Sequence, residues 1–167
     1  MARLGDICEI LDSKRVPITA SDRKAGIYPY YGANGVQDYV NDYIFDDELV
    51  LLAEDGGHFG STDKPIAYRV SGKCWVNNHA HLVKMKDSCD IKYLYYYLKI
   101  ANLMPYVSGT TRLKLTQKKL KEIPVVLPTK DKQTAFVAIA EQADKSKFEL
   151  RKSIEAIDAV IKSLING

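Results

Sequence analysis

Two short stretches of the sequence carry side chains that could do chemistry. The first, CWVNNHAH from Cys74 to His81, brings a cysteine and two histidines close together along the chain. Such side chains bind metals or move protons, and Asn78, His79 and His81 together would suit a small metal-dependent nuclease. Zinc sites, however, need a second pair of Cys or His ligands, and the sequence offers only this one cluster. We therefore favour a structural role for both histidines and expect no metal site.

The second stretch is the glycine-rich segment EDGGHFGSTDK, residues 54–64, which resembles a phosphate-binding loop. A P-loop needs Gly-Lys-Ser/Thr at the start of a helix, and a dinucleotide fingerprint needs three spaced glycines; the segment has neither. The chain also lacks a nucleophile elbow, a glycine-rich S-adenosylmethionine loop and an Asn-Pro-Pro-Tyr motif. We therefore expect no catalytic residues, and we predict an exposed binding loop that presents His58, Phe59, Ser61 and Thr62.

A third stretch, RLKLTQKKLK from Arg112 to Lys121, contains five basic residues and no acidic one. The net charge of the chain is only +3, and the segment NDYIFDDE, residues 41–48, is acidic. A local basic patch on a nearly neutral chain is typical of a surface that contacts phosphates. A solvated helix face has the same composition, so both interpretations stay open.

The elements that must position these side chains alternate in type along residues 1–129. Short apolar or alternating runs between turn residues predict strands at residues 28–32, 36–40, 48–54, 66–70, 74–78 and 80–85. Helical spacing predicts a helix after the capping residue Asp90, a second short helix is expected near Thr116, and residues 123–128 should be extended. This order predicts an α+β fold, with a mixed α/β domain of many short strands.

A long helix is predicted for residues 131–166, which contain no glycine and no proline. At about 1.5 Å per residue this helix would be roughly 50 Å long. Its apolar residues repeat in steps of four and three, as in a coiled coil, and such a stripe must be covered. The helix either folds back on its own domain or pairs with a partner through Leu150, Ile154, Ile157, Ile161 and Leu164.

The cysteine content and the absence of long apolar runs indicate a reduced, aqueous compartment. Cys8, Cys74 and Cys89 are scattered and odd in number, which argues against a disulfide framework. The N-terminal segment has no apolar run or cleavage site of a signal peptide, and no stretch has membrane-spanning length. We therefore expect a soluble, cytoplasmic protein.

The order of these motifs resembles the specificity subunit of type I restriction-modification systems. The resemblance covers nearly the whole chain and rests on LGDICEI, YPYYGANG, FDDELVLLAEDGG, WVNNHAHLVK, YLYYYL and SGTTRLKLTQKKLKEIPVVLP, followed by the long helix. Members of this family commonly carry two target-recognition domains and two long helices, whereas this chain has one of each, which implies a half-length form. A second departure lies in LPTKDKQTAFV, where Gln133 is kept but Lys132 replaces an acidic residue.

The resemblance implies a non-catalytic DNA-recognition subunit. Residues 1–129 would be the target-recognition domain, and residues 130–167 a helix for dimerisation and subunit docking. The implied partners are double-stranded DNA and separate modification (methyltransferase) and restriction subunits, with S-adenosylmethionine on the methyltransferase and no cofactor in this chain. A single-domain chain would replace a two-domain subunit by forming an antiparallel homodimer. The rival functions are the small nuclease and a helix-mediated scaffold that binds no DNA.

The resemblance also divides the candidate residues by role. The tyrosines of residues 28–35 could form a stacking platform or the face of a sheet, but such segments recur in family members that read different DNA, which implies a scaffold role. We expect base contacts from loop residues His58, Phe59, Ser61, Thr62, Thr110, Thr111 and Arg112. We expect phosphate contacts from Lys114, Lys118, Lys119 and Lys121.

Overall fold

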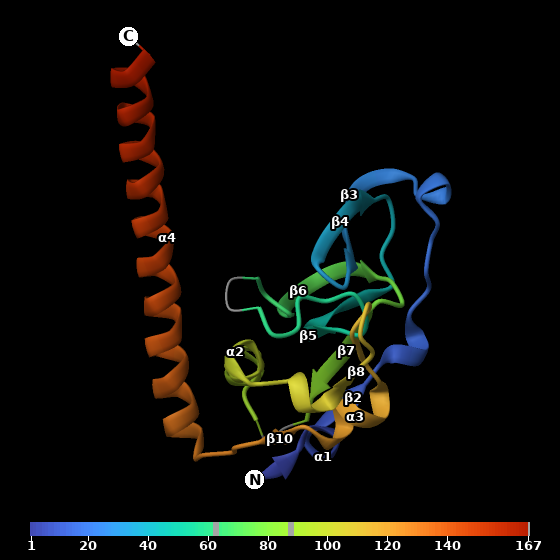
Figure 1. Cartoon of the computed structure of the whole chain (residues 1–167). Helices are drawn as coiled ribbons and strands as arrows, with labels where there is room; N and C mark the ends of the chain where they lie inside the picture. Colours follow the sequence, from blue (N-terminus) through green and yellow to red (C-terminus); the bar gives the residue numbers. More distant parts are fainter. Residues whose placement is uncertain (62–63, 87–88, 167) are drawn as a thin grey trace.

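The computed structural model describes residues 1–61, 64–86 and 89–166, and it has the predicted mixed α+β architecture (Figure 1). Among these residues, six strands form the main sheet in the order β2-β7-β5-β6-β3-β4. β3 and β6 run parallel, and the other neighbours are antiparallel. The strands are β2 (Cys8–Ile10), β3 (Ala25–Gly32), β4 (Gly35–Val40), β5 (Phe45–Ala53), β6 (Ala67–Val76) and β7 (Ala80–Met85).

Two small two-stranded sheets and several helices complete the globular part. β1 (Ala2–Arg3) pairs with β10 (Pro124–Val125), and β8 (Val107–Ser108) pairs with β9 (Lys114–Leu115). The short elements are α1 (Leu4–Ile7), η1 (Asp12–Lys14), η2 (Ala20–Asp22), η3 (Met104–Tyr106) and α3 (Gln117–Glu122). Thr116 caps α3 through a hydrogen bond from the Lys119 amide, which confirms the short helix predicted there.

One strand prediction was wrong: residues 66–70 and 74–78 belong largely to a single strand, β6. The polar interruption at Ser71–Lys73 looked like a turn, but Gly72 adopts a positive φ of 83° and stays in register opposite Asp47 of β5. A glycine tolerates this conformation, so the strand continues through it. β6 is therefore one long strand, and it pairs antiparallel with β5 in the middle of the sheet.

The core lies on both faces of the main sheet, and β5 contributes to both. Leu49 and Leu51 belong to a cluster on one face, whereas Val50 and Leu52 belong to a second cluster that includes residues of α2 and α3. Successive side chains of a strand point to opposite faces, so a strand covered on both sides reads as a continuous apolar run. This explains why ELVLLA lacks the polar alternation of an edge strand.

The tyrosine segment is part of this scaffold rather than a stacking platform. Tyr30 is only 1 % exposed, and its hydroxyl accepts a hydrogen bond from the Ile18 amide and donates one to the Ile18 carbonyl. The Arg23 guanidinium lies 4.2 Å from the centre of its ring. Tyr31 packs half-buried against the core, and Gly35 turns the chain with a φ of 99°. The structure thus confirms that Tyr30 and Tyr31 pack against the sheet, as expected for a scaffold.

Two longer helices follow the main sheet along the chain: α2 (Ile91–Ile100), which packs against the sheet, and α4 (Lys130–Asn166). Asp90 caps α2 by accepting from the amides of Lys92 and Tyr93, as predicted. Gln133 of α4 is buried, accepts from the Asp90 amide and donates to the Pro128 carbonyl, so its amide group ties the two helix starts together. The kept glutamine of LPTKDKQTAFV thus has a structural role.

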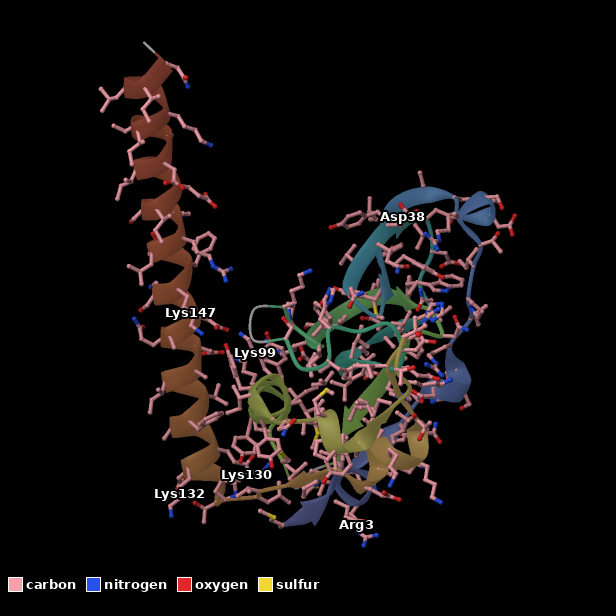
Figure 2. The ribbon with its side chains drawn as sticks, in the orientation of Figure 1. Arg3, Asp38, Lys99, Lys130, Lys132 and Lys147 are labelled. Carbon is pink, nitrogen blue, oxygen red and sulfur yellow. The ribbon has the colours of Figure 1, made fainter. Side chains whose placement is uncertain are left out.

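α4 touches the domain only along its first half. Val137 is buried against α2, and ion pairs join Lys92 to Glu141 at 2.8 Å and Lys99 to Asp144 at 2.9 Å. Figure 2 shows Lys99 extending from α2 toward α4, beyond which the helix stands clear of the sheet. In the described part of the chain, no helix is long and apolar enough to cross a membrane.

Candidate nucleic-acid interface

The β8–β9 hairpin is joined to the end of β5 by backbone hydrogen bonds. The Leu115 amide donates to the Glu54 carbonyl at 2.7 Å, and the Gly56 amide donates to the Leu113 carbonyl at 3.2 Å. Gly109 has a φ of 92°, and a Cβ there would lie 2.5 Å from the Arg112 carbonyl oxygen, so the tip closes only around glycine. The tip therefore presents Thr110, Thr111 and Arg112 to solvent from a rigid base.

Arg112 is held by side chains from two other turns. Its Nη2 donates to Asp55 Oδ1 at 2.9 Å, and the same oxygen lies 2.7 Å from His79 Nδ1. Asn34, at the β3–β4 turn, donates to the Gly56 carbonyl at 3.1 Å. Burial raises the pKa of Asp55, but the hydrogen bonds from His79 and Arg112 outweigh burial and hold that pKa below its ordinary value. An ionised carboxylate thus orients Arg112.

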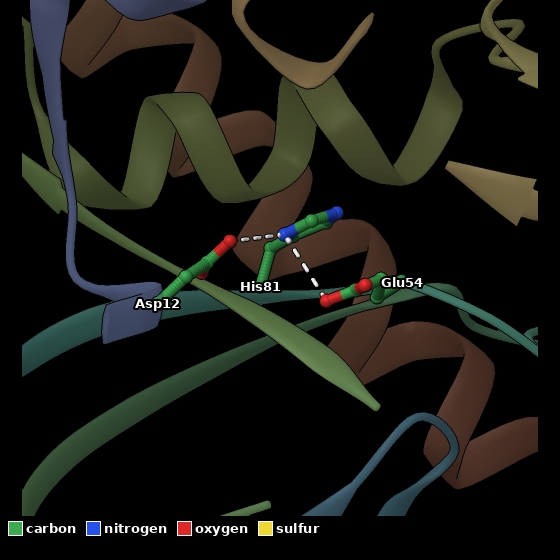
Figure 3. Close-up of side chains that lie close together, drawn as sticks. All are labelled: Asp12, Glu54 and His81. Carbon is green, nitrogen blue, oxygen red and sulfur yellow. Dashed lines mark hydrogen bonds and ion pairs between the residues drawn. The ribbon is translucent and has the colours of Figure 1, made fainter. Parts of the chain in front are cut away.

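Beneath this surface lies a buried charged network centred on His81 (Figure 3). His81 is 0 % exposed; its Nδ1 lies 2.6 Å from Asp12 Oδ2, and its Nε2 lies 2.7 Å from the Leu115 carbonyl oxygen. Both partners offer acceptor oxygens, so both ring nitrogens are engaged by hydrogen-bonding groups of the protein. Asp12 also accepts from the Leu82 amide and from Gln117. The network joins η1, β7, β9 and α3.

Asp12, Glu54 and His81 bring possible metal-ligating atoms within 4.8 Å of one another, but the arrangement does not fit a cation. Both His81 nitrogens already lie within hydrogen-bond distance of protein oxygens, at 2.6 Å from Asp12 and 2.7 Å from the Leu115 carbonyl, so the ring is engaged on both sides. The Arg15 guanidinium lies 2.8 Å from Glu54 Oε2 and also donates to the Ala80 carbonyl. A protein cation therefore takes the place that a metal would need.

The predicted phosphate-contacting lysines lie on β9 and α3, which follow the hairpin tip along the chain. Lys114 forms an ion pair with Glu54 at 3.3 Å, and Lys119 forms one with Glu122 at 2.8 Å. Lys118 and Lys121 are exposed and line a shallow pocket with Arg3. Within the described part of the chain, Lys118 and Lys121 make no ion pair, so their charges are more available than those of Lys114 and Lys119.

In the predicted 58–62 reading loop, the exposure expected of Phe59 is wrong. Phe59 is only 8 % exposed and belongs to the core cluster that contains Leu103, because the loop folds back and buries its ring. His58 is half-buried, and Ser61 lines the groove between α2 and α4, away from Arg112. Thr62 lies outside the described residues. The structure therefore does not bring this loop and the hairpin tip together into one surface.

The structure argues against the nuclease hypothesis, because one of its two histidines is inaccessible. His81 is fully buried, so it cannot meet a substrate, and His79 precedes β7 instead of sharing the strand with it. The structure supports the structural role predicted for both, with His79 as a partner of Asp55. Of the three residues proposed for that activity, only Asn78 is exposed.

Sequence reasoning missed Asp55, Asn34 and Arg15. Asp55 and Arg112 are 57 positions apart, so no local motif joins them. The signal that could have found Asp55 is its place just after the buried second half of β5, where polar loop residues are held by a rigid scaffold. Asn34 has the same kind of position, in the turn between β3 and β4.

Comparisons with known proteins agree on one family. Residues 1–158 match the family described as "Type I restriction modification DNA specificity domain". A putative type I restriction enzyme specificity subunit of Haemophilus influenzae is 40 % identical over 138 residues, and the EcoprrI specificity subunit of Escherichia coli is 26 % identical over 144 residues. These alignments cover 83 % and 84 % of this chain but only 35 % of each relative, so the chain spans about a third of their length.

A solved structure shares the fold. The crystal structure of the type I restriction-modification system S subunit from M. genitalium superposes with a TM-score of 0.70 at 14 % sequence identity. The superposition covers 86 % of this chain and 38 % of that chain. At this level of identity the likeness concerns the fold alone, which is that of one portion of the longer S subunit.

Proposed function

Because this chain belongs to the type I restriction-modification DNA specificity family, we propose that it is the DNA-recognition module of a type I restriction-modification enzyme. It would direct a separate methyltransferase and a separate endonuclease subunit to their target in the cytoplasm. The module itself has no catalytic role, and S-adenosylmethionine belongs to the methyltransferase. Membership of the family supports the class of function, and the geometry of the interface supports the choice of contact residues.

The observation that carries the proposal is the exposed tip of the β8–β9 hairpin. Thr110, Thr111 and Arg112 project from a hairpin fixed to β5, and the basic helix α3 follows directly along the chain. Hydroxyl and guanidinium groups read base edges, whereas lysines hold phosphates and set the register. The two kinds of group thus follow each other along the chain, from the hairpin tip through β9 to α3.

The basic helix supplies the first test. Changing Lys118 and Lys119 to alanine together should weaken binding to random and specific duplexes alike, because phosphate contacts carry no sequence information. Each lost contact should flatten the dependence of log K on log salt by about one unit. Lys118 should account for most of the effect, since Lys119 is already paired with Glu122. Fluorescence anisotropy over a salt series measures the slope.

A matched control removes two lysines from a different surface. Lys145 and Lys152 are exposed on α4, so their double alanine variant has the same net charge as the test variant. We expect the control to keep the wild-type slope. An unchanged slope in the Lys118/Lys119 variant would remove α3 from the interface. A wild-type chain that binds no duplex at low salt would favour the helix-mediated scaffold instead.

The proposal includes an antiparallel homodimer through α4. The 37 residues of α4 span about 55 Å. At 3.6 residues per turn, Leu150, Ile157 and Leu164 lie on the side opposite Val137, which faces α2. The apolar stripe therefore points away from its own domain, where a second copy can reach it. Antiparallel helices would carry one recognition domain at each end, about 16 base pairs apart at most at 3.4 Å per base pair.

A further inference from the structure

The Arg112 guanidinium is restrained at one nitrogen and open at the others. Nη2 donates to Asp55 Oδ1, whereas Nε and Nη1 have no partner among the described residues. The side chain is 61 % exposed, so these donors face solvent. Arginine has five N–H donors in a planar fork. Asp55 takes one N–H of Nη2, and the second N–H of Nη2 lies side by side with an N–H of either Nε or Nη1, so one pair of donors remains available for a ligand outside the protein.

The restraint on Arg112 is itself well supported. Asp55 is only 19 % exposed, and His79 Nδ1 holds the same carboxylate oxygen that accepts from Arg112. Gly56 has a φ of 62°, and a Cβ there would lie 3.4 Å from Arg112 Nε, so the guanidinium lies against bare backbone. Fixing a flexible side chain before it binds reduces the entropy lost on binding. Asp55 and His79 therefore orient the fork in advance.

The charge balance around Arg112 favours a base edge over a phosphate. The Asp55 carboxylate beside the guanidinium offsets much of its positive charge and would repel a phosphate at close range. The pairing uses one N–H of Nη2 and leaves the other directional N–H donors available. In the major groove, guanine presents two adjacent acceptors, O6 and N7, whereas adenine, thymine and cytosine each present at most one. The fork of Arg112 matches guanine.

We propose that Arg112 is a specificity-determining residue that reads a guanine in the major groove, with Asp55 and His79 as the positioning residues that hold its fork. The inference rests on the proposed DNA-recognition function and names the base that one side chain selects. The hairpin base supports the geometry, because Leu113 and Leu115 are joined by backbone hydrogen bonds to Gly56 and Glu54 on either side of Asp55. Arg112, which would contact the base, and Asp55, which positions it, thus lie on two adjoining segments.

The test is selection from a random duplex library with the full chain, followed by affinity measurements on the selected site and its single-base variants. The wild-type chain should select a duplex in which each half-site has guanine at the same fixed position. Arg112→Lys keeps the charge but loses the fork, so it should keep affinity for random DNA and lose discrimination at that position by roughly 5- to 150-fold. Asp55→Asn should lose discrimination at the same position.

The control is Arg69→Lys, since Arg69 also forms an exposed pair with a carboxylate, Glu48, at 3.1 Å, but lies outside the interface. It should leave the selected site unchanged. Equal weakening of Arg112→Lys on all sequences, or unchanged discrimination in either Arg112→Lys or Asp55→Asn, would overturn the inference while leaving DNA recognition intact. A wild-type chain that selects no sequence would overturn the proposed function, and the inference with it.

Discussion

Replacing Asp12 with alanine is expected to lower the free energy of unfolding by about 3 to 5 kcal/mol, the usual cost of removing one partner of a buried charged pair. The change would leave the His81 ring, the Leu82 amide and the Gln117 amide without their acceptor. In a chain of this size the melting temperature should fall by about 6 to 20 °C. Thermal unfolding followed by circular dichroism measures the shift.

An exposed ion pair provides the control. Glu48→Ala removes a carboxylate from the Arg69 pair, in which both side chains are at least a third exposed, and should cost at most about 1 kcal/mol. If Asp12→Ala were no more destabilising than Glu48→Ala, the charged network would not stabilise the fold.

Acid should weaken the same network. Burial raises the pKa of Asp12, but hydrogen bonds from His81, Leu82 and Gln117 hold it below its ordinary value of 3.8. A lowered folded-state pKa means that Asp12 stabilises the fold above that ordinary value and loses its contribution as the pH falls through the folded-state pKa. Asp12→Asn should therefore show a shallower loss of stability below about pH 4 than wild type.

Replacing Ile157 with aspartate is expected to convert the proposed dimer into a monomer. Ile157 is 57 % exposed in the single chain and lies in the middle of the apolar stripe. Losing its burial costs about 1.5 to 3 kcal/mol per copy, and two-fold symmetry doubles this cost. The dimer dissociation constant should rise by roughly 10²- to 10⁴-fold. Light scattering over a concentration series gives the mass.

Ser163→Asp is the matched control, because it introduces the same charge on α4 about 140° around the helix from the centre of the stripe. It should leave the dimer intact. A wild-type chain that stays monomeric at high concentration, or equal masses for wild type and Ile157→Asp, would contradict pairing through the stripe. The module would then function as one part of a longer or heteromeric subunit.

The sequence predicted best what depends on neighbouring residues. The cap at Asp90, the start of α3 after Thr116 and the span of α4 follow from local signals, and the structure confirms them. The site depends on contacts between distant residues: Asp12 meets His81 across 69 positions, and Asp55 meets Arg112 across 57. No periodicity or spacing encodes such pairs. Phe59 was misplaced for a related reason, since a glycine-rich loop gives no local sign that it folds back onto the core.

The central claim is that this chain chooses a DNA sequence, and methylation mapping tests it most directly. The measurement compares genomic DNA from a host carrying the partner methyltransferase with and without this chain as its specificity component. We predict one methylated motif that appears only with the chain and consists of two inverted elements separated by a spacer. No chain-dependent motif would contradict sequence recognition, and an asymmetric or uninterrupted motif would contradict the antiparallel pair.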